Sequence, residues 1–179
     1  EMYFFCFLNI FCLIMIKMEK LSFATIIQRK KRAQLIVENS KKLPRQRSAE
    51  WYLKRQSVIS ASDAGSALNI NRFKSRRDLL IEKCQKKPII NTIINKEAIN
   101  WGNKYEPVAK QIYEQISGEK INDVGLMIHP KYKYIGASPD GIVINTGKII
   151  EIKCPYSNRP LGPPSGYYYA QVQLQLEVA

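Results

Sequence analysis

The sequence contains few of the side chains that hold zinc or iron–sulfur clusters. Its single histidine is His129, and its four cysteines form no Cys-x-x-Cys pair. Zinc fingers and ribbons are excluded, because they need paired Cys or His ligands at short spacing. An iron–sulfur cluster is not supported either, since only Cys84 and Cys154 lie beyond the first 46 residues. We expect reduced, mostly buried thiols, as in intracellular proteins, and a surface position for His129 in a turn with Pro130.

The sequence also lacks an apolar stretch of the length that crosses a bilayer. Residues Tyr3 to Ile16 are almost wholly apolar, whereas a membrane-spanning helix needs about 20 such residues. The stretch has neither the basic start nor the small-residue cleavage site of a signal peptide. Two interpretations stay open, a signal anchor or a segment outside the folded domain with Met18 as the natural start. No membrane partner is expected for the folded part.

Acidic residues are scarce relative to basic ones. The 179 residues include 15 Asp and Glu against 28 Lys and Arg, which gives a net charge of +13. A charge of this size and sign indicates a polyanionic partner, nucleic acid first and an acidic membrane surface second. The hydrophobic content of 45% is enough for a sizeable core, and the length is that of one domain.

The positive charge is concentrated near the N-terminus. Between Lys17 and Arg55, twelve basic residues stand against three acidic ones, and the densest cluster is Arg29-Lys30-Lys31-Arg32. Residues 21–40 have fair helix propensity. The segment is either a flexible basic arm or a surface for phosphate contact or, in a eukaryotic host, nuclear targeting.

The stretch from Ser138 to Lys153 predicts two strands joined by a tight turn. Two β-branched runs flank Asn145-Thr146-Gly147, which is a typical turn sequence. Residues two apart in a strand share a face, so Glu151 and Lys153 point the same way. Asp140 stands at the mouth of the first strand, and the hairpin brings its carboxylate near Glu151.

These charged side chains admit two interpretations. One is a solvated sheet face with a cross-strand salt bridge, since Glu and Lys are rarely buried unless they are paired. The other is a Mg²⁺ site, in which Asp140 and Glu151 hold a hard cation that keeps several waters and takes phosphate oxygens. Lys153 would then orient the attacking water or stabilise charge on the phosphate.

A second candidate site lies in two short predicted helices. Ser48 can cap the first, with Trp51 packing inward, and Ser60 or Ser62 can cap the second. The free N–H groups of such a helix start, a serine hydroxyl and the nearby Arg55 together make an anion site. The alternative is a capped helix after a turn, with no ligand.

The remaining patterns predict further helices and strands. The stretch from Trp101 to Ala109 is expected to lead into a helix that runs to about Ile116 and is ended by Gly118. Strands are expected over residues 121–128 and 132–137. Residues 167–179 alternate glutamine with apolar residues, which allows a strand, but we favour a helix that packs across the preceding sheet.

The chain is expected to divide into a tail and one domain. Residues 1–46, first apolar and then basic, form the tail and need not belong to the fold. Residues 47–179 form the domain. We expect this domain to be incomplete at its C-terminus, because the chain stops at Ala179 inside an apolar-periodic segment.

Six blocks of the sequence, taken in order, resemble the lambda-exonuclease/YqaJ-like viral recombinase family of the PD-(D/E)xK nuclease superfamily. The resemblance covers about Ser48 to Val178. The blocks are Trp51 with Arg55, Ile59-Ser60-Ala61-Ser62, Trp101-Gly102-x-x-Tyr105-Glu106, Ser138-Pro139-Asp140-Gly141, Glu151-Ile152-Lys153-Cys154-Pro155 and Tyr169-Ala170-Gln171-Val172-Gln173.

The resemblance implies an α/β fold with a restriction-endonuclease-like core, in which helices flank a central mixed sheet. It implies that Asp140 and Glu151 bind Mg²⁺, for which Mn²⁺ is a possible substitute, with the Ile152 carbonyl as an extra ligand. Lys153 would be the catalytic lysine. The resemblance also implies that Glu106 supports the metal-bound water network and that Gln171 contacts the nucleophile side of the site.

The resemblance further implies that Arg55, Ser62 and Ser138 hold a DNA 5′-phosphate. The implied activity is a 5′→3′ exonuclease on double-stranded DNA ends in recombination or repair. A structure-specific endonuclease of the same fold and a non-catalytic DNA-binding domain are the alternatives. A single-strand-annealing recombinase partner and a homo-oligomeric ring are the implied assemblies.

Overall fold

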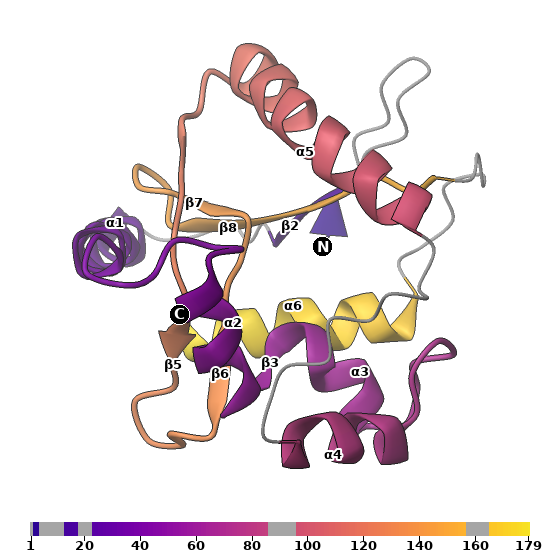
Figure 1. Cartoon of the computed structure of the whole chain (residues 1–179). Coiled ribbons are helices and arrows are strands. Elements are labelled where there is room, and N and C mark those ends of the chain that lie inside the picture. The colour runs from indigo at the N-terminus through magenta and orange to yellow at the C-terminus, as the bar shows by residue number, and fades with distance from the viewer. Residues whose placement is uncertain (1, 4–12, 18–22, 86–95, 157–164) are drawn as a thin grey trace. The chain divides into compact units, whose positions relative to one another are not determined.

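The computed structural model describes residues 2–3, 13–17, 23–85, 96–156 and 165–179, and Figure 1 shows their helices and strands. The chain divides into two compact units. The first contains Glu1–Val37, Asn91–Asp123 and Asp140–Gly162, and the second contains Glu38–Ile90, Val124–Pro139 and Pro163–Ala179. Each unit has its own sheet and helices, so the predicted α/β class is confirmed. A helix with the length and apolar character of a membrane span is absent from the described ranges.

The first unit is built on a five-stranded antiparallel sheet with the order β1-β2-β8-β7-β4. The strands are β1 (Met2–Tyr3), β2 (Leu13–Lys17), β4 (Ile121–Asn122), β7 (Gly141–Val143) and β8 (Lys148–Lys153). β7 and β8 form the predicted hairpin, with Gly141 opposite Ile150 and Val143 opposite Lys148. Because β2 pairs with the other edge of β8, β8 is an inner strand of this sheet.

The turn of this hairpin depends on Gly147. Its φ of +67° lies in the left-handed region, which glycine adopts at little cost and other residues rarely adopt. Its N–H donates to the Val143 carbonyl at 2.8 Å and closes the turn. A Cβ at this position would also lie 2.7 Å from the Cβ of Arg29 on α1 (Phe23–Ser40). Both the backbone conformation and the close approach of α1 therefore require glycine here.

Helix α5 (Lys96–Ser117) packs against β8 and supplies the core of the first unit. Ala109 and Tyr113 are its buried residues, and they cluster with four buried sheet residues, Ile121, Val143, Ile150 and Ile152. The helix begins at Lys96, so the stretch from Trp101 to Ala109, which was expected to lead into a helix, already lies within it. Gly118, with a φ of +66°, follows its last turn as predicted.

The N-terminal stretch contributes elements to the first unit. Helix α1 covers the residues for which helix propensity is fair. β2 pairs antiparallel with β8, with Met15 opposite Glu151. Residues 4–12 of the apolar stretch lie outside the described residues. The division into a tail of residues 1–46 and a domain of residues 47–179 stays a prediction.

The second unit is organised around a three-stranded mixed sheet with the order β3-β6-β5. β3 (Ile59–Ser60) runs parallel to β6 (Ile135–Ala137), and β5 (Met127–Ile128) runs antiparallel to it. The helices are α2 (Ala49–Gln56), the 3₁₀ helix η1 (Ala61–Asp63), α3 (Ala64–Ala67), α4 (Arg76–Cys84) and α6 (Gly166–Val178). The strand predicted over residues 121–128 is instead two short strands, β4 and β5, in different sheets, and β6 is shorter than the strand predicted over residues 132–137.

Two local predictions are confirmed in the second unit. Ser48 caps α2, because its Oγ accepts a hydrogen bond from the Trp51 N–H at 3.2 Å. Trp51 packs inward against Val58 and Leu126. Residues 166–178 form a helix rather than a strand, and this helix, α6, packs against β6.

The predicted surface position of His129 is wrong, because only 5% of this residue is exposed. Its Nδ1 accepts hydrogen bonds from the backbone N–H groups of Lys131 and Tyr132, at 3.1 and 2.9 Å. The imidazole therefore lies over the turn, and its Nδ1 accepts from both amides of the turn. The expected burial of thiols also fails for Cys84, which is exposed, whereas Cys154 is half-buried.

Candidate active site

Asp140 is held at the start of β7 by the backbone of β8. Its Oδ2 accepts a hydrogen bond from the Ile152 N–H at 2.6 Å, across the hairpin. Gly141, the next residue, leaves no room for a side chain, because a Cβ there would overlap Ile121 on β4. The close packing of three strands therefore fixes the Asp140 carboxylate beside the C-terminal end of β8.

Glu151 and Lys153 lie on one face of β8, as the strand period predicts. Lys153 Nζ is 2.5 Å from Glu151 Oε1. The Glu151 side chain is only 4% exposed and that of Lys153 is 25% exposed. The pair is thus an ion pair inside the unit, and the interpretation as a solvated sheet face does not hold for Glu151.

Glu106 comes to the same region from α5. This helix packs against β8 through Ala109 and Tyr113. Burial raises the pKa of the Asp140 carboxyl well above its usual range, and the nearby Glu151 and Glu106 carboxylates raise that pKa further. The Lys153 ammonium and the hydrogen bond from the Ile152 N–H act in the opposite direction.

The donor set of this cluster fits a hard divalent cation. Asp140 and Glu151 offer carboxylate oxygens, and the Ile152 carbonyl lies between Glu151 and Lys153 in the strand. Within the described ranges, no group of three or more His, Cys, Asp or Glu side chains stands close enough to enclose a metal ion.

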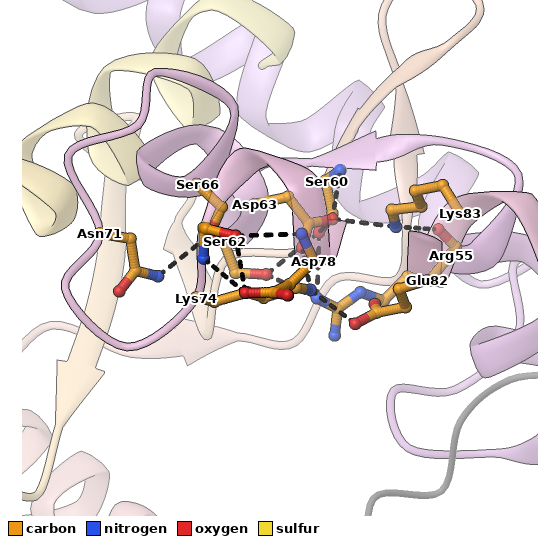
Figure 2. A network of polar contacts seen from close by, with 11 residues as sticks. Arg55, Ser60, Ser62, Asp63, Ser66, Asn71, Lys74, Asp78, Glu82 and Lys83 are labelled. Carbon is orange, nitrogen blue, oxygen red and sulfur yellow. Dashed lines mark hydrogen bonds and ion pairs between the residues drawn. The ribbon is translucent and has the colours of Figure 1, made fainter. Parts of the chain in front are cut away.

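The second unit holds a different polar cluster, formed by Arg55, Ser60 and Ser62 (Figure 2). Arg55 Nη2 donates to Ser62 Oγ at 2.5 Å and to Ser60 Oγ at 3.0 Å. Ser62 is exposed, whereas Ser60 is 3% exposed. The structure thus joins the predicted anion-site residues on α2 and η1.

Ser138 joins this cluster through Trp51. The Trp51 Nε1–H donates to Ser138 Oγ at 3.1 Å, and the guanidinium carbon of Arg55 lies 4.5 Å from the centre of the Trp51 ring. A cation over an indole face is attracted by the ring electrons. Trp51 therefore orients both a guanidinium and a hydroxyl, and Ser62 is linked to it only through its hydrogen bond with Arg55.

The predicted site residues fall into two groups. Glu106, Asp140, Glu151, Ile152 and Lys153 belong to the first unit, whereas Arg55, Ser62, Ser138 and Gln171 belong to the second. Gln171 is 8% exposed on α6. Its predicted role at the nucleophile side stays a prediction.

Two residues with direct contacts to the anion cluster were not predicted as site residues. Asp63 accepts hydrogen bonds from Ser60, and Lys83 pairs with Asp63. The spacing Ser60-x-x-Asp63 is a capping-box pattern and could have indicated Asp63. Lys83 has no such signal, because its contact depends on how α4 packs.

Comparisons with known proteins give one family and several relatives. The YqaJ-like viral recombinase domain matches residues 50–179. Protein R354 of Acanthamoeba polyphaga mimivirus is 31% identical over 157 residues, which cover 77% of this chain and 28% of that protein. YqaJ of Bacillus subtilis strain 168 is 28% identical over 124 residues, which cover 69% of this chain and 37% of that protein. The chain therefore spans about a third of the length of these two relatives.

Two solved structures of an alkaline exonuclease are also similar to this chain. The alkaline exonuclease LHK-Exo from Laribacter hongkongensis superposes with a TM-score of 0.59 at 29% identity, over 74% of this chain and 69% of that chain. LHK-Exo in complex with dAMP gives a TM-score of 0.58 at 27% identity, over 73% and 68% of the two chains. The likeness thus extends over most of both chains.

Proposed function

This chain belongs to the YqaJ-like viral recombinase domain family, and we propose that it is a metal-dependent deoxyribonuclease that degrades duplex DNA from its 5′ ends. The family resemblance carried by the sequence motifs is confirmed by the matched domain. The fold is that of the alkaline exonuclease, which is restriction-endonuclease-like as predicted. The net charge of +13 suits a DNA substrate.

The observation that carries the proposal is the cluster of Asp140, Glu151, Glu106 and Lys153 in the first unit. Burial and two neighbouring carboxylates raise the pKa of Asp140, so the fold concentrates negative charge at one point. Such a cluster disfavours its own ionised form unless a cation is present. Together with the alkaline exonuclease relative, this supports a metal-dependent hydrolase.

Asp140, Glu151 and the Ile152 carbonyl would hold the cation, and we propose Mg²⁺, with Mn²⁺ as a substitute. When bound, such a cation polarises the phosphate and lowers the pKa of its bound water. Lys153 would leave its ion pair with Glu151 and stabilise the charge that develops on the phosphate oxygens. Glu106 would accept a hydrogen bond from water on the α5 side.

The 5′-end preference is proposed for the second unit. A relative of this chain forms a complex with dAMP, and the Arg55, Ser62 and Ser138 side chains offer a guanidinium and two hydroxyls. An arginine fork binds phosphate with a geometry that lysine cannot provide. Only Pro139 separates Ser138 from Asp140 in the chain, so a residue of the proposed phosphate site and a proposed metal ligand are near neighbours in the sequence.

A comparison of linear and circular duplexes tests the proposal. Linear duplex should be degraded to mononucleotides with Mg²⁺ or Mn²⁺, and chelator should stop the reaction. Cleavage of circular duplex would favour the structure-specific endonuclease instead. Binding of DNA without cleavage of either substrate would favour the non-catalytic domain.

The biological setting is proposed from the family alone. A viral recombinase domain suggests recombination or repair, with a single-strand-annealing recombinase as partner and a homo-oligomeric ring as assembly. Sedimentation of the purified protein, with and without duplex DNA, would measure whether a ring forms.

A further inference from the structure

A buried carboxylate lies directly behind the anion cluster of the second unit. Asp63 is 6% exposed, and its Oδ2 accepts hydrogen bonds from the Ser60 N–H at 3.0 Å and the Ser60 hydroxyl at 2.7 Å. Lys83 Nζ lies 2.9 Å from the same oxygen, and Lys74 Nζ lies 3.6 Å from Oδ1. Figure 2 shows these contacts converging on one side chain.

These partners keep Asp63 ionised. Burial opposes its ionisation, but Lys83, Ser60 and Lys74 together outweigh that effect and hold the pKa of the carboxyl below its usual value. An ionised carboxylate only accepts hydrogen bonds. The Ser60 hydroxyl must therefore donate its single hydrogen to Asp63.

The hydrogen bond from the Ser60 hydroxyl to Asp63 fixes the direction of the other hydrogen bonds that Ser60 makes. Ser60 Oγ lies 3.0 Å from Ser62 Oγ and 3.0 Å from Arg55 Nη2. Because its hydrogen is used by Asp63, Ser60 can only accept from both, so Ser62 is the donor of the serine pair. In this arrangement the Ser62 hydrogen is directed at Ser60, and Arg55 Nη2 donates to both serines. An incoming phosphate, which is an acceptor, would therefore be met by the other N–H groups of Arg55 and would take the Ser62 hydrogen in place of Ser60.

Lys83 ties the same carboxylate to the backbone of Arg55. Its Nζ donates to the Arg55 carbonyl at 2.9 Å, at the end of α2. The Lys83 side chain is 16% exposed, so its ammonium is turned toward protein groups. One ion pair therefore holds both the backbone that carries the guanidinium and the hydroxyl network in front of it.

We propose that Asp63 and Lys83 are positioning residues that, through Ser60 and the Arg55 backbone, set the geometry of Arg55 and Ser62 in the 5′-phosphate site. This inference rests on the proposed 5′-end preference. The Asp63 and Lys83 charges compensate each other, so Arg55 remains the cation of the cluster that meets the phosphate. Replacing Asp63 and Lys83 keeps every side chain that is proposed to contact the phosphate. The orientation of those side chains is then no longer fixed.

The test measures binding of dAMP against deoxyadenosine, which lacks the phosphate, and compares rates on duplexes with 5′-phosphate and 5′-hydroxyl ends. The variants are Asp63→Asn, Lys83→Met and the double variant. Lys54→Met is the matched control, because it removes a lysine paired with Glu50 on the exposed side of α2. We expect each single variant and the double variant to weaken dAMP binding about tenfold or more and to reduce the 5′-phosphate preference in parallel. The control should behave as wild type.

The double variant separates positioning from folding. A single variant leaves one buried charge without its partner, which is strongly destabilising, whereas removing both charges is often tolerated. The melting temperature of the double variant should therefore recover toward wild type while dAMP selectivity stays lost. Selectivity that recovers together with the melting temperature would overturn the inference and leave Asp63 and Lys83 a structural role.

The same experiment distinguishes failure of the inference from failure of the proposed function. If wild type prefers dAMP over deoxyadenosine and all three variants keep that preference, the positioning role is overturned and the phosphate site stands. If wild type shows no preference for dAMP or for 5′-phosphate ends, the phosphate site itself is overturned, and the positioning role with it.

Discussion

Lys153 Nζ lies 2.5 Å from Oε1 of Glu151, and the two residues stand on the same face of the inner strand β8. Burying the Glu151 carboxylate in this ion pair gives little net stability over a well-packed apolar side chain, because the carboxylate loses its hydration. Its presence inside a small sheet is therefore better explained by the chemistry of the site than by the stability of the unit.

Replacing Lys153 should separate these two explanations. Lys153→Ala should lower the turnover of linear duplex about 10²- to 10³-fold, the usual loss when one group that stabilises transition-state charge is removed. Lys148→Ala is the matched control, because Lys148 also lies on β8 in an ion pair, with Glu119 at 2.7 Å. Rates would be followed on radiolabelled linear duplex at saturating DNA. A near-normal rate for Lys153→Ala would return this lysine to a structural role.

We expect Asp140 to lower the stability of the metal-free protein at neutral pH. Its pKa is raised, chiefly by burial and then by Glu151, so the folded state disfavours the ionised form. The stability of wild type should fall as pH rises from the unfolded-state pKa through the folded-state pKa. Asp140→Asn lacks this penalty and should melt higher in chelator at pH 7, by about 2–4 °C for each kcal/mol gained. We also expect this variant to be inactive, because Asp140 is a proposed metal ligand.

Glu119→Gln is a control for which we expect the opposite change in melting temperature. Burial raises the pKa of Glu119, but hydrogen bonds from Lys148 and Tyr113 outweigh burial and leave that pKa lowered. Its stabilising effect is present above the unfolded-state pKa and is lost as pH falls through the folded-state pKa. Glu119→Gln should therefore melt lower at pH 7. The interpretation of Asp140 would be wrong if Asp140→Asn also melted lower under these conditions.

The sequence predicted the features that depend on neighbouring residues. The Asn145-Thr146-Gly147 turn sequence correctly predicted the β7–β8 hairpin, because only a residue such as Gly147 adopts a positive φ easily. Ser48 correctly predicted the start of α2, because a cap acts within one turn. The order of the motifs correctly predicted the family, since each motif is itself short.

Features that depend on distant residues could not be predicted. Lys83 reaches Asp63 and the Arg55 carbonyl only because α4 packs beside them, and no sequence pattern encodes that packing. His129 is buried because its ring accepts hydrogen bonds from the turn that follows it, whereas its position before a proline is typical of the surface. The pairing of β2 with β8 likewise depends on tertiary contacts.

Binding of DNA should depend steeply on salt, and α1 should contribute to it. Lys30, Lys31 and Arg32 are exposed on this helix. Each phosphate contact changes the slope of log K against log salt by about 0.9. Replacing all three residues by glutamine should therefore reduce the slope by up to about 3, with uniform weakening across sequences. Fluorescence anisotropy between low and moderate salt would measure the slope, and an unchanged slope would exclude α1 from the DNA contact.

Arg55→Lys should show whether the fork geometry of arginine matters at the anion cluster. In the structure a single nitrogen, Nη2, donates to both Ser60 and Ser62, and the guanidinium plane stands over Trp51. Lysine keeps the charge but loses the planar set of donors. We therefore expect a clear loss of preference for 5′-phosphate over 5′-hydroxyl ends, with weaker dAMP binding by about tenfold, or roughly 1.4 kcal/mol.

Two comparisons make the Arg55→Lys result decisive. Arg77→Lys, at an exposed position of α4, carries the same chemical change and should keep the preference. Arg55→Ala, which removes the charge as well, should lose more of the 5′-phosphate preference than Arg55→Lys. The difference in preference between the two variants measures what the charge alone contributes to phosphate binding. If Arg55→Lys retains the full wild-type preference, the arginine acts as a point charge and the fork is not what recognises the phosphate. If wild type itself degrades both kinds of end at equal rates, the recognition of a 5′-phosphate is refuted, and the endonuclease alternative becomes the better explanation of the carboxylate cluster around Asp140.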